Sequence, residues 1–127
     1  MSARILVVDD EEVVVRSCLR ILGASGHQVE AVSSGGDALR RVEQGPVDLI
    51  ILDIMMPKID GLEVLQRVKE SHPDIDVIMI TGLSQIETAV RAMKLGAYDY
   101  ITKPFKLDEV DLIIRNGLER KRLRDEN

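Results

Sequence analysis

The chain has 127 residues, the length of one ordinary domain, and 45% of them are hydrophobic, enough to form a core. A formal net charge of −5 and an aromatic content of 2% argue against nucleic-acid binding, because phosphate backbones attract basic surfaces and bases stack on aromatic rings. The lone Cys18 excludes an internal disulfide, and we expect it to be a small buried apolar residue.

Short aliphatic runs alternate along the chain with longer segments of helical periodicity. Strands that are buried on both faces read as continuous β-branched and aliphatic runs, whereas helices repeat their apolar residues every three or four positions. The first half of the chain predicts a strand, a helix, a weaker strand, a helix and a strongly buried strand, at Ile5–Val8, Glu11–Leu22, Gln28–Val32, Gly36–Gln44 and Leu49–Leu52.

The second half of the chain continues the same alternation. It predicts a helix, a strand, a helix, a short strand and a last helix, at Gly61–Ser71, Val77–Ile80, Glu87–Leu95, Tyr98–Ile101 and from Leu107 onward. Five strands that alternate with five helices predict an α/β fold of the (βα)5 type, a doubly wound parallel sheet with helices on both faces.

Neither a signal peptide nor a membrane span is evident in the sequence. Strand-like sequence begins within a few residues of Met1, and Asp48, Asp53 and Asp76 interrupt the longest apolar stretches. We therefore expect a cytoplasmic protein that makes no contact with a membrane. His27 and His72 lie in turn-like contexts, and we interpret both as solvated loop residues.

Candidate functional side chains follow four of the five predicted strands, whereas the second strand is followed by Ser33 and Ser34, which offer no charge. In a doubly wound sheet, ligands bind beyond the carboxyl ends of the strands, so these positions are the candidates for a functional site. The residues are Asp9, Asp10 and Glu11 after the first strand, Asp53 after the third, Thr81 and Gly82 after the fourth, and Lys103 after the fifth.

Carboxylates that converge at one edge of a sheet repel each other, and a hard cation relieves that repulsion. An all-oxygen ligand set suits Mg²⁺, and the single cysteine excludes a thiolate metal site. A cation, an ammonium group and a hydroxyl that face one carboxylate are suited to the oxygens of a phosphoryl group, with aspartate as the nucleophile. These residues therefore predict phosphorylation of an aspartate rather than hydrolysis of a carbon substrate.

Four motifs in this order resemble the response-regulator receiver domains of two-component systems over essentially the whole chain. They are the acidic cluster Asp9-Asp10-Glu11, the segment D-x-x-M-P-x-x-D-G from Asp53 to Gly61, the pair Thr81-Gly82, and Lys103-Pro104-Phe105. The resemblance implies a flavodoxin-like sheet with strand order 2-1-3-4-5 and a receiver domain over residues 1–118.

The resemblance also implies a role for each matching position. Asp53 would be the phosphoacceptor, with Lys103 and Thr81 contacting the phosphoryl oxygens. Mg²⁺ would be bound by the carboxylates of Asp10 and Asp53 and the backbone carbonyl of Met55, with Asp9 acting through water. Tyr100 would follow Thr81 as the switch aromatic, on a face spanning roughly residues 84–115. The Lys103–Pro104 peptide would be cis.

The expected partner is a sensor histidine kinase or a phosphotransfer protein. Residues 119–127 are almost entirely charged and show no helix stop signal, and their junction resembles that of enhancer-binding transcriptional activators. Two alternatives stay open here. The segment is either the start of a linker helix, with a homodimer and a C-terminal output domain beyond it, or the frayed end of a stand-alone receiver.

Two other functions agree less well with the residues. Phosphatases that form an aspartyl-phosphate carry D-x-D after the first strand, whereas Asp9 and Asp10 are adjacent here and Asp53 follows the third strand. A flavin-binding module would need a loop rich in glycine and hydroxyl groups to hold phosphate, and an acidic first loop would repel it.

Overall fold

The computed structural model of the chain describes residues 2–54, 60–82, 86–103 and 107–125. At its centre is a parallel sheet of five strands in the order β2-β1-β3-β4-β5. The strands are β1 (Arg4–Val8), β2 (Gln28–Val32), β3 (Leu49–Asp53), β4 (Asp76–Thr81) and β5 (Asp99–Thr102). The predicted (βα)5 doubly wound fold and its strand order are confirmed.

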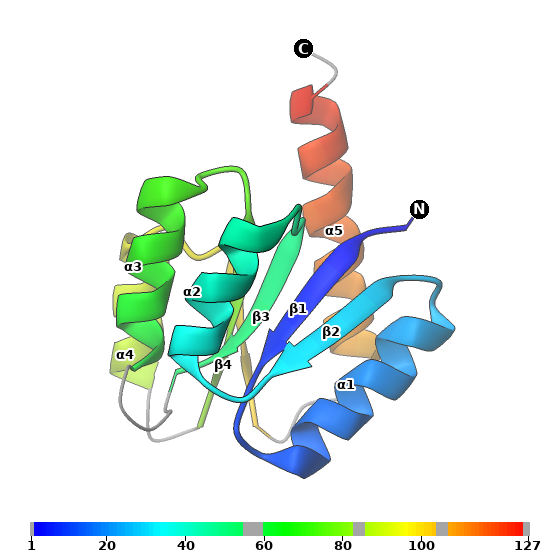
Figure 1. Cartoon of the computed structure of the whole chain (residues 1–127), viewed down its shortest axis with the longest axis horizontal. Coiled ribbons are helices and arrows are strands. Elements are labelled where there is room, and N and C mark those ends of the chain that lie inside the picture. The colour runs from blue at the N-terminus through cyan, green and yellow to red at the C-terminus, as the bar shows by residue number, and fades with distance from the viewer. Residues whose placement is uncertain (1, 55–59, 83–85, 104–106, 126–127) are drawn as a thin grey trace.

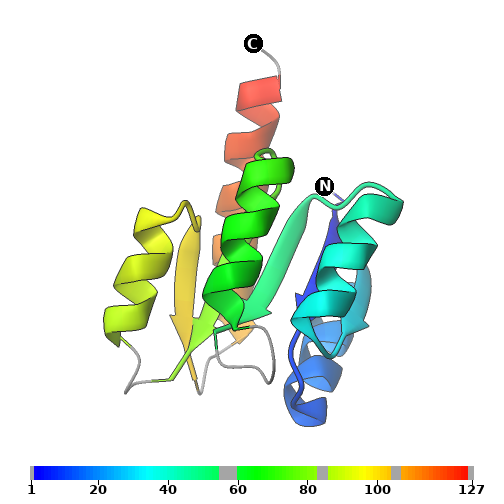
Figure 2. The ribbon, with the colours of Figure 1, turned by 60° about the vertical axis from the view of Figure 1, so that its left-hand side comes forward.

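Five helices cover the two faces of this sheet. They are α1 (Glu12–Ala24), α2 (Gly35–Gln44), α3 (Gly61–Ser71), α4 (Ile86–Lys94) and α5 (Leu107–Asp125). Helices α1 and α5 lie on one face, and α2, α3 and α4 lie on the other (Figure 1). Figure 2 shows the same layers from the side of α3 and α4, with the carboxyl ends of the strands at the lower edge.

The core is aliphatic and lies in two layers, one on each side of the sheet. Successive residues of a strand point to opposite faces. Leu6 and Val8 of β1 therefore belong to the layer on the side of α2, α3 and α4, whereas Ile5 and Val7 belong to the layer on the side of α1 and α5. Strands β3 and β4 are buried along their whole length, which explains their uninterrupted aliphatic sequences.

Element boundaries agree with the prediction to within one or two residues. The two central strands extend slightly further than expected, to Asp53 and Thr81, because the hydrogen-bonded ladder includes the polar residue that follows each aliphatic run. Gly96, just after α4, has φ +107°, a conformation that glycine adopts at little cost.

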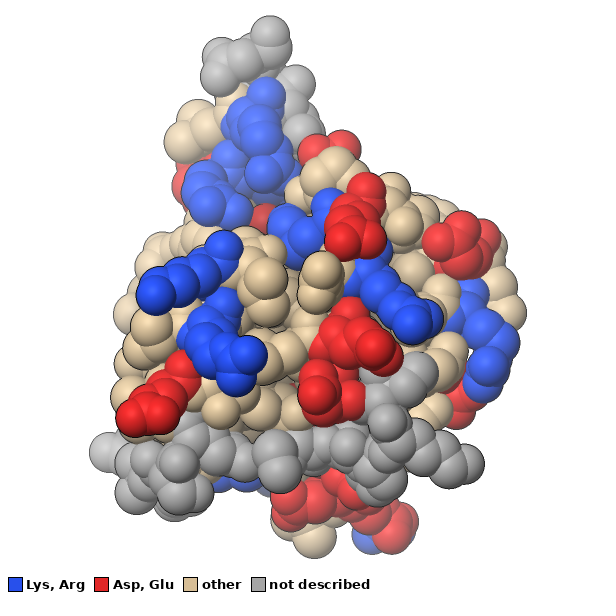
Figure 3. All heavy atoms as spheres, turned by 90° about the vertical axis from the view of Figure 1, so that its left-hand side faces the viewer, with Lys and Arg blue, Asp and Glu red and all other residues tan. Residues whose placement is uncertain are grey.

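The last two turns of α5 are held against the amino-terminal edge of the sheet, opposite the edge formed by the carboxyl ends of the strands. Arg120 donates a hydrogen bond of 2.9 Å to Asp76, a buried carboxylate at the start of β4, and its guanidinium lies 4.3 Å from the ring centre of Tyr98. Lys121 donates to the backbone carbonyl of Asp74 in the loop before β4. Helix α5 extends beyond the sheet at this edge, where lysine and arginine side chains gather (Figures 1 and 3).

Both histidines lie in loops, as expected, but each is half-buried and makes a specific contact instead of being freely solvated. His27 is half-buried because the turn after α1 folds back onto β1, and its Nδ1 accepts a hydrogen bond of 3.1 Å from the backbone N–H of Ala3. His72 is half-buried at the end of α3, with its Nε2 2.9 Å from Glu43 of α2. The contacts join elements distant in sequence, so the local turn pattern did not reveal them.

The buried position expected for Cys18 is confirmed. The thiol lies in the layer under α1 and α5, and its burial raises its pKa to about 11, with a smaller contribution from the nearby charge of Asp9. A thiol with a raised pKa is a poor nucleophile at neutral pH. In the described part of the chain, no helix has the length and apolarity needed to cross a bilayer.

Candidate functional site

Three carboxylates meet at the carboxyl edge of the sheet. Asp9 and Asp53 are buried, with 1% and 4% of their surfaces exposed, whereas Asp10 is exposed. One carboxylate oxygen from each of the three lies within 4.8 Å of the others. In Figure 3, acidic side chains also gather at the lowest part of the molecule.

Strand register brings these residues together from distant parts of the sequence. Val8 of β1 is paired with Leu52 of β3, so the residues that follow them, Asp9 and Asp53, lie side by side. Thr81 of β4 is paired with Thr102 of β5, and the backbone N–H of Lys103 donates a hydrogen bond of 2.8 Å to the carbonyl of Thr81.

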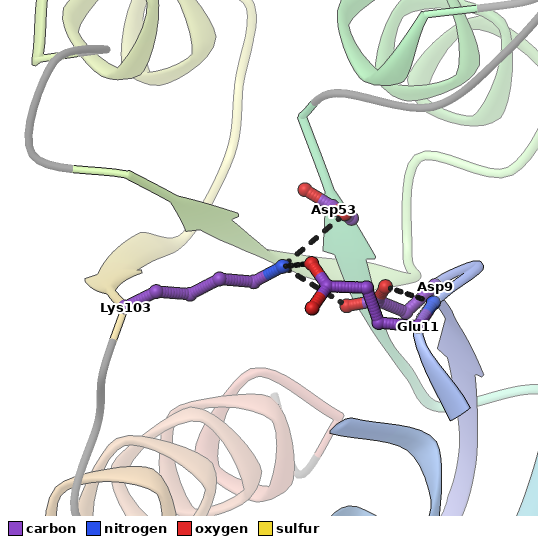
Figure 4. A network of polar contacts seen from close by, with 4 residues as sticks. All are labelled: Asp9, Glu11, Asp53 and Lys103. Atoms are coloured by element: carbon purple, nitrogen blue, oxygen red, sulfur yellow. Dashed lines mark hydrogen bonds and ion pairs between the residues drawn. The ribbon is translucent and has the colours of Figure 1, made fainter. Parts of the chain in front are cut away.

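Lys103 reaches across the strand ends to three carboxylates (Figure 4). Its Nζ lies 2.6 Å from Oε1 of Glu11, 3.4 Å from Oδ2 of Asp53 and 3.6 Å from Oδ2 of Asp9. Burial by itself would lower the pKa of Lys103, but the hydrogen bond to Glu11 and the charges of Asp53 and Asp9 outweigh burial and raise that pKa. The ammonium group is therefore charged at neutral pH.

Asp9 has an unusual electrostatic environment. Burial raises the pKa of its carboxyl to about 6, and the charge of Asp53 adds to this effect, whereas the backbone N–H of Glu11 and the charge of Lys103 oppose it. Oδ1 accepts the 2.9 Å hydrogen bond from Glu11, but the buried Oδ2 accepts no hydrogen bond from the described residues. A buried carboxylate oxygen without a donor suits coordination of a cation.

The structure describes two of the remaining predicted site residues, Thr81 and Tyr100. Thr81 is fully buried, and its hydroxyl donates a 3.0 Å hydrogen bond to the carbonyl of Gly82. Tyr100 lies on β5 with 36% of its surface exposed. Met55, expected to offer a backbone carbonyl, and Pro104, expected in a cis peptide, lie outside the described residues.

Helix α3 begins in close contact with the strand that carries Asp53. A Cβ atom added to Gly61 would lie 2.5 Å from the carbonyl oxygen of Asp53 and 2.7 Å from Cα of Ile54. Gly61 also donates a 2.8 Å backbone hydrogen bond to Ile54, and the side chain of Asp60 accepts one from Glu63 to cap the helix. Glycine is thus required for this close approach of two backbones.

The interaction of Glu11 with Lys103 was not anticipated from the sequence. Glu11 was included only as a member of the acidic cluster, whereas its carboxylate makes the shortest of the three contacts with the lysine. One signal was available. Glu11 precedes a helix at the position where serine, threonine, aspartate or asparagine is preferred as a cap.

Comparison with known proteins identifies the family. The model for the response regulator receiver domain matches residues 5–115. The chain belongs to the response regulator receiver family. Receiver domains of this family are the signalling switches of two-component response regulators, and the resemblance seen in the motifs is confirmed.

Curated relatives of this receiver domain are considerably longer than the chain. Nitrogen assimilation regulatory protein NtrX of Azorhizobium caulinodans is 41% identical over 128 residues, covering 99% of the chain and 28% of that protein. Response regulator MprA of Mycobacterium ulcerans is 37% identical over 126 residues, covering 99% of the chain and 54% of that protein. The chain thus spans about half of MprA and less than a third of NtrX.

Solved structures of receiver proteins superimpose closely on this domain. NtrX from Brucella abortus has a TM-score of 0.95 at 40% identity, covering 99% of the chain and 29% of that structure. A receiver domain protein from Clostridium thermocellum has a TM-score of 0.91 at 34% identity, covering 95% of the chain and 98% of that structure. The crystallised chain of the second match is therefore covered almost completely by this domain.

Proposed function

We propose that this receiver domain accepts a phosphoryl group on Asp53. The observation that carries the proposal is the position of the Asp53 carboxylate, buried at the end of β3 and 3.4 Å from the ammonium of Lys103. Two further carboxylates lie beside it. A carboxylate flanked by an ammonium group and a candidate cation site has the partners that nucleophilic attack on phosphorus requires.

The reaction transfers one phosphoryl group from a donor to a carboxylate oxygen of Asp53. A new oxygen–phosphorus bond forms as the bond between phosphorus and the donor breaks, and its electron pair leaves with the donor. Lys103 is placed to neutralise charge on the transferred oxygens, and Thr81, the last residue of the adjacent strand β4, would donate a hydrogen bond from its hydroxyl to one of them. Both residues therefore bind the transferred group and form no covalent bond.

The residues present also fit Mg²⁺. Asp9, Asp10 and Asp53 offer three carboxylate oxygens within 4.8 Å of one another, and the buried Oδ2 of Asp9 accepts no hydrogen bond from the described residues. By resemblance, Asp10, Asp53 and the carbonyl of Met55 would hold the ion, with Asp9 acting through water. The ion would supply positive charge for the oxygens of the phosphoryl group.

The proposed consequence of phosphorylation is a change in the surface formed by α4, β5 and α5. Thr81 and the partly exposed Tyr100 would report the change to this surface. Exposed apolar side chains are available there for a partner, namely Ile86, Val90, Met93 and Leu112. A phosphoryl group that binds one arrangement of these residues better than another shifts their populations.

We further propose a place for the domain in a signalling protein. A sensor histidine kinase or a phosphotransfer protein would supply the phosphoryl group in the cytoplasm. The curated relatives extend well beyond the region matched here, which supports a C-terminal output domain after a linker that starts near residue 119. A homodimer through α5 would place two such output domains side by side. No direct contact with nucleic acid is proposed for residues 1–127, because their net charge is −5.

Phosphorylation of Asp53 can be tested with acetyl phosphate and Mg²⁺. Intact-mass spectrometry of the parent should show one added phosphoryl group, and Asp53→Asn should show none. Asp60→Asn is the matched control, because it also removes one carboxylate near α3, while asparagine retains the helix-capping oxygen that Asp60 provides.

The control variant should be labelled like the parent, and omission of Mg²⁺ should strongly reduce labelling. Equal labelling of Asp53→Asn and the parent would contradict the assignment of Asp53. Loss of labelling in both variants would show that removing any nearby carboxylate disturbs the site, and the experiment would then no longer support Asp53 as the acceptor.

A further inference from the structure

Glu11 holds the ammonium group of Lys103 more closely than the proposed phosphoacceptor does. The distance from Nζ to Oε1 of Glu11 is 2.6 Å, against 3.4 Å to Asp53 (Figure 4). The first distance is that of a strong charge-assisted hydrogen bond, and the second is near the upper limit for a hydrogen bond. In the structure, therefore, the main partner of the lysine is Glu11.

The position of Glu11 in the fold favours this contact over a local one. Glu11 has extended backbone angles (φ −87°, ψ 114°) just before α1, where a side chain commonly caps the helix by accepting a hydrogen bond from it. No such bond is made by Glu11. Its backbone N–H instead donates to Asp9, and its carboxylate reaches a lysine 92 residues away in sequence.

The contact can be broken without unfolding any element. Side-chain exposure is 59% for Glu11 and 24% for Lys103, so the glutamate can move into water while the lysine stays at the strand ends. Pairs this exposed typically change an equilibrium constant by a factor of about five at most. An anionic phosphoryl group next to Asp53 would compete for the same ammonium donors.

We propose that Glu11 is a positioning residue that occupies Lys103 in the unphosphorylated domain and is displaced when a phosphoryl donor binds. This inference rests on the proposed phosphorylation of Asp53. The carboxylate of Glu11 acts as an internal competitor for the lysine. It weakens donor binding until the phosphoryl group displaces it from the lysine.

The test compares three variants in the rate of phosphorylation by acetyl phosphate at saturating Mg²⁺, across a range of donor concentrations. Glu11→Gln removes the charge, and Glu11→Asp keeps the charge but shortens the side chain by one methylene. Glu12→Gln is the matched control. It removes a charge one residue away, from a side chain that is 74% exposed and paired with Arg16 on the outer surface of α1.

Competition predicts that Glu11→Gln lowers the half-saturating donor concentration by about two- to fivefold. It predicts a shift in the same direction for Glu11→Asp, because the shorter side chain cannot hold the lysine at 2.6 Å. Glu12→Gln should behave like the parent. Circular dichroism and thermal unfolding of each variant would verify that the fold is retained.

Simple repulsion of the donor by the charge of Glu11 predicts a different pattern. Glu11→Gln would then bind the donor better, but Glu11→Asp would behave like the parent, and this result would overturn the inference. An unchanged Glu11→Gln, or an equal effect of Glu12→Gln, would overturn it as well. Labelling of the unsubstituted protein distinguishes failure of this inference from failure of the proposed function. If that protein is not labelled on Asp53, the proposed function itself is contradicted.

Discussion

Asp9 is a carboxylate that the fold buries although this is electrostatically unfavourable. Its pKa is raised to about 6, chiefly by burial and secondarily by Asp53, above the ordinary value of 3.8. The folded state therefore binds this proton more tightly than the unfolded state does. The contribution of Asp9 to stability is greatest below about pH 4 and is lost as the pH rises through about 6.

We expect Asp9→Asn to be more stable than the parent at pH 7.5 in EDTA, by about 2–3 kcal/mol, because the uncharged amide avoids the cost of burying a charge. The difference should be small near pH 4, should grow up to about pH 6 and should then level off. Urea unfolding at several pH values measures it.

Asp10→Asn provides the control for the effect of burial. It removes one charge from the same cluster, but from an exposed side chain, so its effect on stability should be smaller. If the two variants show the same pH dependence, burial is not the origin of the raised pKa of Asp9.

Single residues show where sequence reasoning was sufficient and where it failed. The residues at the strand ends could be predicted to converge because parallel strands share one carboxyl edge, and Asp9 and Asp53 do lie there, both buried. The contact of Glu11 with Lys103 depends on side-chain reach across two loops, which no local pattern encodes. The environments of His27 and His72 were missed for the same reason.

At the scale of elements, the start of α3 fixes the position of Asp53. The helix approaches the end of β3 so closely that only the missing side chain of Gly61 allows the contact. The sequence motif contains this glycine, but its physical reason appears only when both backbones are seen. Helix and strand types were predictable because aliphatic runs and helical spacing differ clearly in this chain.

Gly61→Ala should destabilise the domain by about 1–3 kcal/mol, because its Cβ would overlap the backbone of Asp53 and Ile54. The required shift of α3 should also slow phosphorylation of Asp53. Denaturant unfolding measures the first effect and acetyl phosphate labelling the second.

Gly36→Ala is the matched control within α2. Its added Cβ would meet only the end of the Arg40 side chain, at 3.8 Å, so we expect a stability equal to that of the parent or up to about 1 kcal/mol higher. A Gly61→Ala variant as stable and as active as Gly36→Ala would show that α3 can move without cost.

At the scale of the whole molecule, the charged end of α5 packs against the edge of the sheet at which the strands begin. The receiver was expected to end near residue 118, yet Arg120 and Lys121 beyond it contact Asp76 and the loop that precedes it. The sequence showed only a run of charges, because the partners of these cations lie more than 40 residues away. The junction between receiver and linker remains a proposal.

Truncation after Leu118 should destabilise the domain by about 1–3 kcal/mol, because the buried carboxylate of Asp76 loses the hydrogen bond from Arg120. Leu123→Glu is the control, since Leu123 is 51% exposed and its replacement leaves that hydrogen bond intact. If α5 also forms the proposed homodimer, both variants should sediment as monomers while only the truncation loses stability. Equal stability of the truncated and parent proteins would contradict the anchoring of α5.

The unequal covering of the sheet has a consequence for the chain as it leaves the ribosome. On one face, α2, α3 and α4 alternate with the strands along the chain, so all three helices of that layer precede β5. On the other face, β4 and β5 await α5, whose Val110, Ile114 and Leu118 complete that layer (Figure 1). A nascent chain that has reached only residue 106 thus has all five strands but an aliphatic surface that includes Ile78, Ile80 and Ile101 still open to water. Chaperones, or a second nascent chain on the same messenger, would find their binding surface on this face during synthesis.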